Sequence, residues 1–579
     1  MRRLFTFFEA HAWLAPAIML GAFLIIGVAA SRDYGIAWDE PVQRQYGSEV
    51  YGYILHHDQQ LLVDRHRYYG PVFELLLYSL EKALLLSDTR SIYMMRHLVN
   101  FLVFWAGVVF FYLLCKYLFR SWKLGLLGST FLVLSPAIFA HGFYNTKDIP
   151  FLSLFIAGVY TLVRYLDRPV LRWAAVHGAV CALLVDTRIV GILLPALTVL
   201  FLGYDAASRR RRGSEVRKAA LSLCVFAAVW AGGTVLLWPT LWRDPLKGFV
   251  QGFEGMQNFP WEATVLYLGR YVWATKLPWH YTPVWIGVST PLAYVILFAV
   301  GLAVAARSVV WTGSIRSSIR GDGVPKDAAA NRGRPERGQS PIETRRTRLL
   351  VLLWLLVPPA YYAVSRAVLY DEWRHSFFVY PALLVVSLVG LMSLWGLVRD
   401  RFHGVGRRLA ASALVGLVAL NLGTTAIFML RYHPYQNVYF NSLVGGVKGA
   451  SGKFELDYWG LSYRKGLEYI LRSDPARMIP VLSANPPGRY NADILKPADR
   501  KRLVFVEDAA EAKYYITNFR WEKKRLAPEA ERYAVQVGGA NLMAVYQLGG
   551  TAEQGRLHHG SARSRRQGEG EGEGEGFGF

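Results

Sequence analysis

Long apolar runs are the feature that most constrains what this chain can fold into. A helix needs about 20 apolar residues to cross the hydrocarbon core of a bilayer, where only helices and closed barrels satisfy their backbone groups. Clear runs of this kind lie at about 12–30, 97–118, 124–141, 149–166, 219–238, 283–306, 349–366, 377–398 and 409–430. The sequence therefore predicts an all-α polytopic membrane bundle.

The composition agrees with this prediction and excludes other classes of protein. Of the 579 residues, 53% are hydrophobic and 18% are charged, whereas a typical soluble domain is about 25% charged. These values exclude a disordered chain and an ordinary soluble enzyme.

A longer apolar segment at 173–204 is interrupted by Asp186 and Arg188. Arg172 precedes this segment and four arginines follow it at 209–212. Because Lys and Arg concentrate on the cytoplasmic side, both ends of the segment are expected in the cytoplasm, which requires a hairpin of two short helices turning near Asp186. The protein is therefore expected to cross the cell membrane with about 11 transmembrane helices. Its N-terminus is expected in the cytoplasm and its C-terminal region outside the cytoplasm.

These spans divide the chain into a transmembrane domain and several appended segments. We expect the bundle at 1–430, with a first outer loop at 31–96 whose helical periodicity suits amphipathic helices at the membrane surface. A flexible cytoplasmic loop is expected at 307–348. A small C-terminal α/β domain is expected at 431–550, because β-rich runs there alternate with a helical pattern. A disordered Gly-Glu tail follows at 551–579.

The net charge of +23 could suggest nucleic acid as a partner, but its distribution argues otherwise. The segments assigned to the cytoplasm hold 28 Lys and Arg against 9 Asp and Glu, whereas the first outer loop holds 7 against 9. Most of the excess is therefore the positive-inside signal of a membrane protein. We expect membrane lipid as a partner and no nucleic acid.

Two acidic motifs fall on the predicted outer face. The first is the pair Asp39-Glu40, with Arg44 about one helical turn further on. A carboxylate there could accept a proton from an attacking hydroxyl, and a guanidinium could hold a phosphate. Alternatively, Asp39 caps a helix whose first turn contains Pro41.

The second acidic motif is His141-Gly-Phe-Tyr-Asn-Thr-Lys-Asp-Ile-Pro150, between the third and fourth spans. Its Lys147 and Asp148 could share a cleft with the first motif. The alternative is a short turn in which Asp148 caps the fourth span and Lys147 extends toward the membrane surface.

Further candidate residues lie on the same predicted face. Arg188, at the tip of the hairpin, could line a polar pocket or simply pair with Asp186. Arg374 and His375, in the loop Tyr-Asp-Glu-Trp-Arg-His at 370–375, could bind an anionic headgroup or anchor the chain at the membrane interface. Together these groups suit a lipid-phosphate substrate whose head reacts at the outer surface.

The acidic pair after the first span, the amphipathic first loop and the second acidic turn resemble the GT-C superfamily of integral-membrane glycosyltransferases. The most similar members are the family 39 group of protein O-mannosyltransferases and the aminoarabinose transferases of lipid A. Four further stretches are similar to bacterial phospholipid-carrier-dependent glycosyltransferases, namely 68–71, 145–151, 370–375 and 433–441. The resemblance spans about 1–470.

The resemblance implies a reaction and assigns roles to residues. In that family an Asp of the first outer loop is the catalytic base, which corresponds to Asp39, with Glu40 completing the pair and Asp148 as the second acid. The base deprotonates an acceptor hydroxyl, which attacks the anomeric carbon with inversion while polyprenyl phosphate leaves. Cations offset the developing phosphate charge. The candidates for this role are Arg44, Lys147, Arg188, Arg374 and His375.

No cofactor and no obligatory metal are predicted, because Arg and Lys can bind a monophosphate; a divalent ion held by the clustered carboxylates is the alternative. The donor sugar stays open, as does the acceptor, which could be a glycan, a lipid or a protein. The competing function is a transporter or flippase of a lipid-linked saccharide. A flippase would need charged residues along a path through the bilayer, whereas here they gather at one face.

Overall fold

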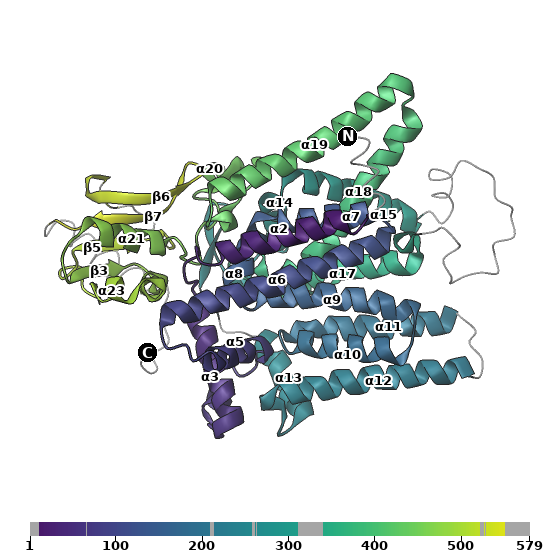
Figure 1. Cartoon of the computed structure of the whole chain (residues 1–579), viewed down its shortest axis with the longest axis horizontal. Coiled ribbons are helices and arrows are strands. Elements are labelled where there is room, and N and C mark those ends of the chain that lie inside the picture. The colour runs from purple at the N-terminus through teal and green to yellow at the C-terminus, as the bar shows by residue number, and fades with distance from the viewer. Residues whose placement is uncertain are drawn as a thin grey trace.

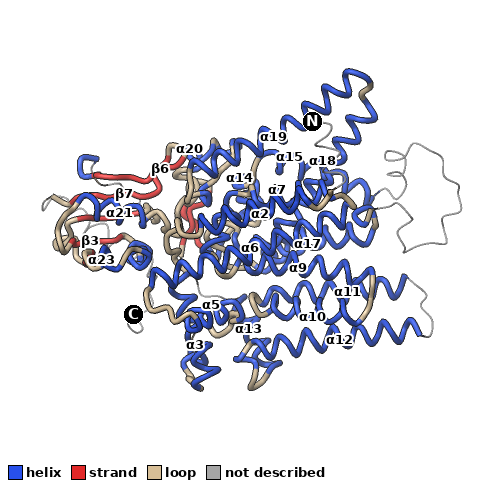
Figure 2. Tube along the Cα trace, in the orientation of Figure 1, coloured by secondary structure: helices blue, strands red, loops and turns tan. Residues whose placement is uncertain are grey.

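The computed structural model describes residues 11–549 apart from 65, 209–213, 258–260, 262, 311–339, 522–525 and 527. Helices dominate the described chain, and a small sheet lies at one end of the long helices (Figures 1 and 2). Most of the predicted loop 307–348 and the whole predicted tail 551–579 lie outside the described residues.

The bundle consists of apolar helices, most of which run roughly alongside one another (Figure 1). They are α2 (Leu14–Ala30), α6 (Thr89–Phe119), α7 (Trp122–Val133), α8 (Pro136–Tyr144), α9 (Asp148–Asp167), α10 (Leu171–Val185), α11 (Leu193–Ser208), α12 (Ser214–Leu237), α14 (Tyr281–Ser289), α15 (Leu292–Val310), α17 (Arg345–Ser365), α18 (Tyr380–Arg401) and α19 (Gly404–Arg431). Every predicted apolar run overlaps at least one of them. The predicted hairpin at 173–204 is α10 followed by α11, with the turn at 186–188.

Among the described residues, seven helical segments are long and apolar enough to cross a membrane, or eight if the bent pair α7 and α8 is one span. The helices α2, α10 and α15 are apolar but shorter. The chain thus has the helices of an integral membrane protein, and the count of 11 crossings stays a prediction.

The run at 124–141, which the sequence analysis treated as one span, is broken in the structure. Helices α7 and α8 meet at an angle of 69°. The break falls at Ser135, immediately before Pro136 in the first turn of α8. Proline disfavours a helical conformation in the preceding residue and cannot donate a backbone hydrogen bond, which accounts for the bend.

Glycines allow a close crossing of two helices in the bundle core. A Cβ atom on Gly301 of α15 would lie 2.0 Å from the carbonyl oxygen of Val386 of α18. A Cβ atom on Gly390 would lie 2.0 Å from the carbonyl oxygen of Leu297. Small residues at facing positions let two membrane helices approach backbone to backbone. This contact fixes α18, which is preceded by the 3-10 helix η6 (Arg374–Val379).

The first outer loop forms helices of its own at one end of the bundle. These are α3 (Glu40–His56), α4 (Gln60–Val63) and α5 (Val72–Ala83), and α3 runs across the bundle direction (Figure 1). Gly47 of α3 packs directly on α5, where a Cβ atom would lie 2.7 Å from the carbonyl oxygen of Glu74. The predicted helices of this loop are therefore present and packed on each other; their position at a membrane surface stays a prediction.

The C-terminal region folds around a mixed sheet of five strands in the order β4-β3-β5-β7-β6. The strands are β3 (Ile479–Ser483), β4 (Leu503–Val506), β5 (Tyr514–Thr517), β6 (Glu531–Val537) and β7 (Ala540–Gln547). Strand β3 pairs in parallel with β4 and β5, whereas β7 is antiparallel to β5 and β6. Helix α21 (Tyr463–Ser473) packs against β5, β6 and β7.

Shorter elements connect these parts. They are α13 (Pro245–Gln257), β1 (Thr264–Tyr267), β2 (Arg270–Trp273), α20 (Gly446–Ala450), α22 (Pro486–Tyr490), α23 (Pro497–Arg500), and the 3-10 helices η1 (Ile189–Ile192), η2 (Pro239–Leu241), η3 (Ala274–Lys276), η5 (Pro341–Glu343), η7 (Gln436–Val438), η8 (Ser442–Val444), η9 (Asn491–Ile494) and η10 (Pro528–Ala530).

The C-terminal region is bound to the segment that leads into α3. The side chain of Asn491 accepts a hydrogen bond from the backbone N–H of Ile36 and donates one to its carbonyl oxygen, both at 3.0 Å. The N–H of Trp38 donates to the carbonyl oxygen of Trp459 at 3.1 Å. Gly35 lies so close that a Cβ atom would be 2.3 Å from Asn491 Oδ1. These contacts fix the backbone just before Asp39.

Candidate active site

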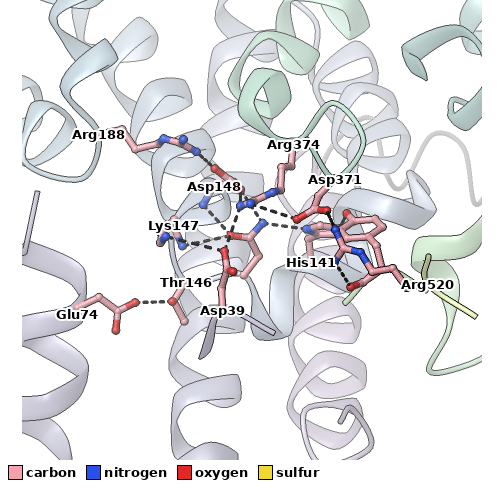
Figure 3. A network of polar contacts seen from close by, with 12 residues as sticks. Asp39, Glu74, His141, Thr146, Lys147, Asp148, Arg188, Asp371, Arg374 and Arg520 are labelled. Carbon is pink, nitrogen blue, oxygen red and sulfur yellow. Dashed lines mark hydrogen bonds and ion pairs between the residues drawn. The ribbon is translucent and has the colours of Figure 1, made fainter. Parts of the chain in front are cut away.

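The two acidic motifs meet in one cluster of polar side chains (Figure 3). Asp39 comes from the start of α3, Lys147 and Asp148 from the start of α9, Arg188 from the hairpin turn, and Arg374 from η6. Five of the eight candidates from the sequence are thus brought into one cluster of alternating charges.

Asp39 occupies the N-cap position of α3, with Pro41 in the first turn, but its side chain makes no capping hydrogen bond. Its Oδ2 instead lies 3.4 Å from Arg374 Nη1 and 3.9 Å from Lys147 Nζ. Burial opposes the charge of this carboxylate, but Arg374, Lys147, Arg520 and His66 outweigh it and hold the pKa of Asp39 below its ordinary value. The side chain keeps 30% of its surface exposed. Asp39 is therefore an ionised carboxylate that a substrate can reach.

Asp148 has a different environment, because its side chain is only 1% exposed. It forms ion pairs with Arg188 and, at 3.4 Å, with Arg374 Nη1. Asn145 donates to Asp148 Oδ2 and accepts from the Asp148 backbone N–H, both at 2.9 Å. Asn145, and not Asp148, therefore satisfies the first N–H group of α9. Asp148 is enclosed, and its carboxylate contacts two arginines and an asparagine.

Arg374 is the centre of the cluster. Besides Asp39 and Asp148 it faces a third carboxylate, Asp371, with its Nη2 atom 3.5 Å from Asp371 Oδ2. The guanidinium lies over the rings of Tyr370 and Trp459, at 4.8 and 5.0 Å from their centroids. Three carboxylates and two aromatic faces fix its plane, so Arg374 presents a pre-oriented cation.

Lys147 and Arg188 complete the cationic side of the cluster. The Lys147 ammonium lies 4.3 Å from the centroid of the Tyr69 ring, and its side chain is 14% exposed. The hairpin that carries Arg188 is pressed against Gly70, where a Cβ atom would lie 1.8 Å from the carbonyl oxygen of Asp186. Only glycine permits this approach, and it brings the stretch at 68–71 to the site. Arg188 pairs with Asp148, so the alternative pairing with Asp186 is not formed.

Two candidates lie outside the cluster. Glu40 is buried and points the other way, accepting from the Ala37 N–H at 2.7 Å and lying 3.0 Å from His97 Nε2. Arg44 makes a two-pronged ion pair with Glu81 of α5, at 2.7 and 2.9 Å. Successive residues of a helix point about 100° apart, so Asp39 and Glu40 cannot both face one site. Glu40 and Arg44 instead fasten α3 to α6 and α5.

His375 lies beside the cluster and contacts it indirectly. Its ring packs edge-on against Tyr370 at a centroid distance of 4.9 Å, and its carbonyl oxygen accepts from the Tyr362 hydroxyl at 3.2 Å. Tyr362 also lines a cavity of about 420 Å³ between the end of α17 and the segment 275–282. His375 is therefore placed between the charged cluster and this cavity.

Sequence reasoning missed Asp371 and Arg520. Asp371 lies within the stretch at 370–375, and its left-handed backbone (φ 55°), followed by that of Glu372 (φ 63°), is uncommon for residues other than glycine. Arg520 follows β5 and pairs with Asp371 at 2.6 Å. No pattern in the sequence connects two residues that are 149 positions apart.

The site offers cations for a phosphate and no evident metal ligands. Within the described parts of the chain, no group of three or more His, Cys, Asp or Glu side chains is arranged to hold a metal ion. Each carboxylate of the cluster already faces an arginine or lysine. The prediction that no metal is obligatory is not tested by this observation.

Comparisons with known proteins found matches among solved structures alone. No protein-family model matches the sequence, and no curated protein matches it. Among solved structures, ArnT from Cupriavidus metallidurans in the apo state has 12% identity and a TM-score of 0.45, with 93% of this chain and 98% of that chain covered. The structure of the same ArnT bound to undecaprenyl phosphate has the same values.

A second similar structure is the apo oligosaccharyltransferase of Archaeoglobus fulgidus, with 9% identity and a TM-score of 0.45. The match covers 86% of this chain and 69% of that chain. The structure is thus similar to these two solved proteins over most of its length, and this similarity is a weak one. At these TM-scores it assigns neither a family nor a function, and both are matters for proposal.

Proposed function

We propose that the protein is a membrane glycosyltransferase of the GT-C type, similar to family 39. It moves a sugar from a polyprenyl-phosphate carrier to an acceptor hydroxyl on the extracytoplasmic face, with Asp39 as the catalytic base. The outer location rests on the positive-inside distribution of charge in the sequence.

The observation that carries the proposal is the position of Asp39. It is a partly exposed carboxylate with Lys147 Nζ at 3.9 Å and Arg374 Nη1 at 3.4 Å. A base and two cations that can hold a phosphate are thus within reach of one small substrate head. Proton acceptance and charge stabilisation at adjacent points are what a displacement at a glycosyl phosphate requires.

Binding of the donor phosphate would change the state of the base. Arg374 and Lys147 lower the pKa of Asp39 against the effect of burial. When the phosphate takes up part of their charge, Asp39 loses stabilisation of its ionised form and becomes more basic. The resting site therefore keeps Asp39 ionised, and the donor itself raises its capacity to accept a proton.

In the proposed reaction the acceptor hydroxyl transfers its proton to Asp39 as its oxygen attacks the anomeric carbon. The bond from that carbon to the phosphate oxygen breaks, and its electron pair leaves with polyprenyl phosphate. Arg374, Lys147 and Arg188 offset the charge that develops on the leaving group. A single displacement of this kind inverts the anomeric configuration.

Asp148 takes a supporting role in this scheme. Its enclosed carboxylate is held by Asn145, Arg188 and Arg374. It therefore holds the two arginines side by side, and both of its oxygens already face a cation or an amide.

The test is a transfer assay with purified protein in liposomes. Polyprenyl-phosphate sugars are supplied with fractionated glycan, lipid and protein acceptors, and the products are analysed by mass spectrometry and NMR. We expect release of polyprenyl phosphate and a product of inverted anomeric configuration. Retention of configuration would contradict a base role for Asp39, and donor that crosses the bilayer unreacted would favour the flippase.

A further inference from the structure

Arg520 is a buried cation that the C-terminal region contributes to the site (Figure 3). It lies three residues after β5, and its Nη1 atom donates to the carbonyl oxygen of Tyr458 at 2.8 Å. Its Nε atom lies 3.8 Å from Glu455 Oε1. A charged side chain is rarely enclosed to this degree unless it is paired, and each of these contacts fixes its position.

On one side Arg520 holds the loop that carries Arg374. Its Nη2 atom is 2.6 Å from Asp371 Oδ1, whereas the other oxygen of the same carboxylate lies 3.5 Å from Arg374 Nη2. The carboxylate of Asp371 is therefore divided between two arginines, with the shorter contact to Arg520. This division leaves Arg374 available to Asp39 and Asp148.

On the other side Arg520 holds the segment that carries the base. Its guanidinium contacts two neighbouring indoles, 5.0 Å from the Trp38 ring centroid and 4.5 Å from that of Trp521. Trp38 immediately precedes Asp39 in the chain. A guanidinium over an aromatic face is attracted by the ring quadrupole, so Arg520 also fixes the backbone next to the base.

The backbone on both sides of the Asp371–Arg520 pair is in uncommon conformations. Asp371 and Glu372 have φ values of 55° and 63°. Phe519 and Trp521, which flank Arg520, have φ values of 61° and 63°. Bulky residues rarely adopt left-handed conformations, and such strain persists only where the surroundings fix it and gathers at functional sites. Two strained segments thus meet at one ion pair.

We propose that Arg520 is a positioning residue that sets the placement of Asp39 relative to Arg374, by packing on Trp38 and pairing with Asp371. This inference rests on the proposed function, and it makes the C-terminal region part of the active site. If Arg520 is neutralised, Asp371 keeps Arg374 as its remaining nearby guanidinium and draws it away from Asp39. The ionised form of Asp39 is then less stabilised.

The direct readout is the protonation of Asp39. The charged and titratable groups that face it are Lys147 and Asp148 from the start of α9, Arg374 from η6, Tyr370 from the preceding loop, His66 from the first outer loop, and Arg520. Carbodiimides react with protonated carboxyls, so labelling of Asp39 with a water-soluble carbodiimide and glycine ethyl ester, followed across pH by peptide mass spectrometry, reports this protonation without any transfer reaction.

The variants are Arg520→Gln, Arg520→Lys and the double variant Asp371→Asn with Arg520→Gln. Arg489→Gln is the matched control, because Arg489 lies in the same region and forms an exposed ion pair with Glu507. We expect Arg520→Gln to raise the labelling midpoint of Asp39 by about one pH unit and Arg520→Lys to raise it less. The double variant should return it toward the wild-type value, because one negative charge is removed along with one positive.

An Arg520→Gln midpoint equal to those of wild type and Arg489→Gln would overturn the inference. So would a double variant whose midpoint stays with Arg520→Gln, because the effect would then not pass through Asp371. If Arg520→Gln does not fold, as judged by gel filtration in detergent, Arg520→Lys and the double variant decide the question in the same way. Failure of the proposed function would be seen separately: the wild-type protein would be labelled as expected but would transfer no sugar.

Discussion

The two acidic motifs look alike in sequence, with a carboxylate beside a second charged residue at the start of a helix, yet the structure treats them differently. Asp39 is 30% exposed, makes no capping hydrogen bond and lies 3.4 and 3.9 Å from two cations. Asp148 is 1% exposed and is bound by an asparagine and two arginines. Exposure and unused hydrogen-bonding capacity, and not charge alone, therefore separate a group that can react from one that holds the site together.

The largest expected change in stability is that of Asp148→Asn. This substitution leaves Arg188 and Arg374 without a buried counter-charge, and breaking a buried pair costs about 3–5 kcal/mol. Unfolding in mixed detergent micelles measures the loss. Asp39→Asn is the matched control and should change stability by less than about 1 kcal/mol, because its pairs are partly exposed. Equal losses in the two variants would remove the distinction between the motifs.

A smaller loss of stability is expected for Arg44→Gln. Glu81 is buried and would lose its two-pronged partner on α3. Leaving a buried group unsatisfied costs about 1–2 kcal/mol of folding stability here, because the lost partner is itself about a third exposed. Transfer activity should stay within about threefold of wild type. A tenfold loss of transfer with unchanged stability would instead place Arg44 in the reacting site.

Lys147→Met should weaken binding of the donor more than it lowers the stability of the fold. Lys147 is a point charge at 3.9 Å from Asp39, and it is free to turn toward a phosphate. We expect the dissociation constant of polyprenyl phosphate to rise about tenfold, which corresponds to roughly 1.4 kcal/mol. Binding is followed by tryptophan fluorescence, with Lys147→Arg as the charge-conserving control. Unchanged affinity in Lys147→Met would exclude Lys147 from the phosphate site.

The smallest expected effect is on the pH dependence of kcat/KM. The pKa of Asp39 is lowered by Arg374 and Lys147 against burial, so the base stays ionised to a lower pH than an ordinary Asp, and the acid limb of kcat/KM is shifted to lower pH in the same way. Removing one cation raises this pKa, and Lys147→Met should move the limb upward by about half a unit, roughly 0.7 kcal/mol. A limb that does not move, or that moves to lower pH, would show that another group controls it.

Much of the bundle could be predicted from the sequence, because hydrophobic runs of membrane length report helices directly. The hairpin at 173–204 was found from two charges and the arginines around it. The break at Pro136 could also have been predicted from the residue itself, since a proline preceded by Ser135 favours a new helix start. The number of membrane crossings could not be predicted, because a bend or a short helix changes this number without changing the apolar pattern.

The site could be predicted only for residues that a local sequence pattern marks. Charged residues beside apolar runs pointed to Asp39, Lys147, Asp148, Arg188 and Arg374. Glu40 points away from the cluster, as helical geometry favours for one of two adjacent residues. Arg520 was missed because its partner Asp371 is 149 residues away, and such contacts arise from packing between elements, on which periodicity carries no information.

The most direct test of the account is the single-turnover rate of transfer by Asp39→Asn, measured in liposomes with donor already bound. We predict a loss of about 10²–10⁴-fold, the usual contribution of a positioned base, with donor affinity within about threefold of wild type. Transfer by Asp39→Asn at the wild-type rate would contradict the central claim that Asp39 accepts the proton of the acceptor.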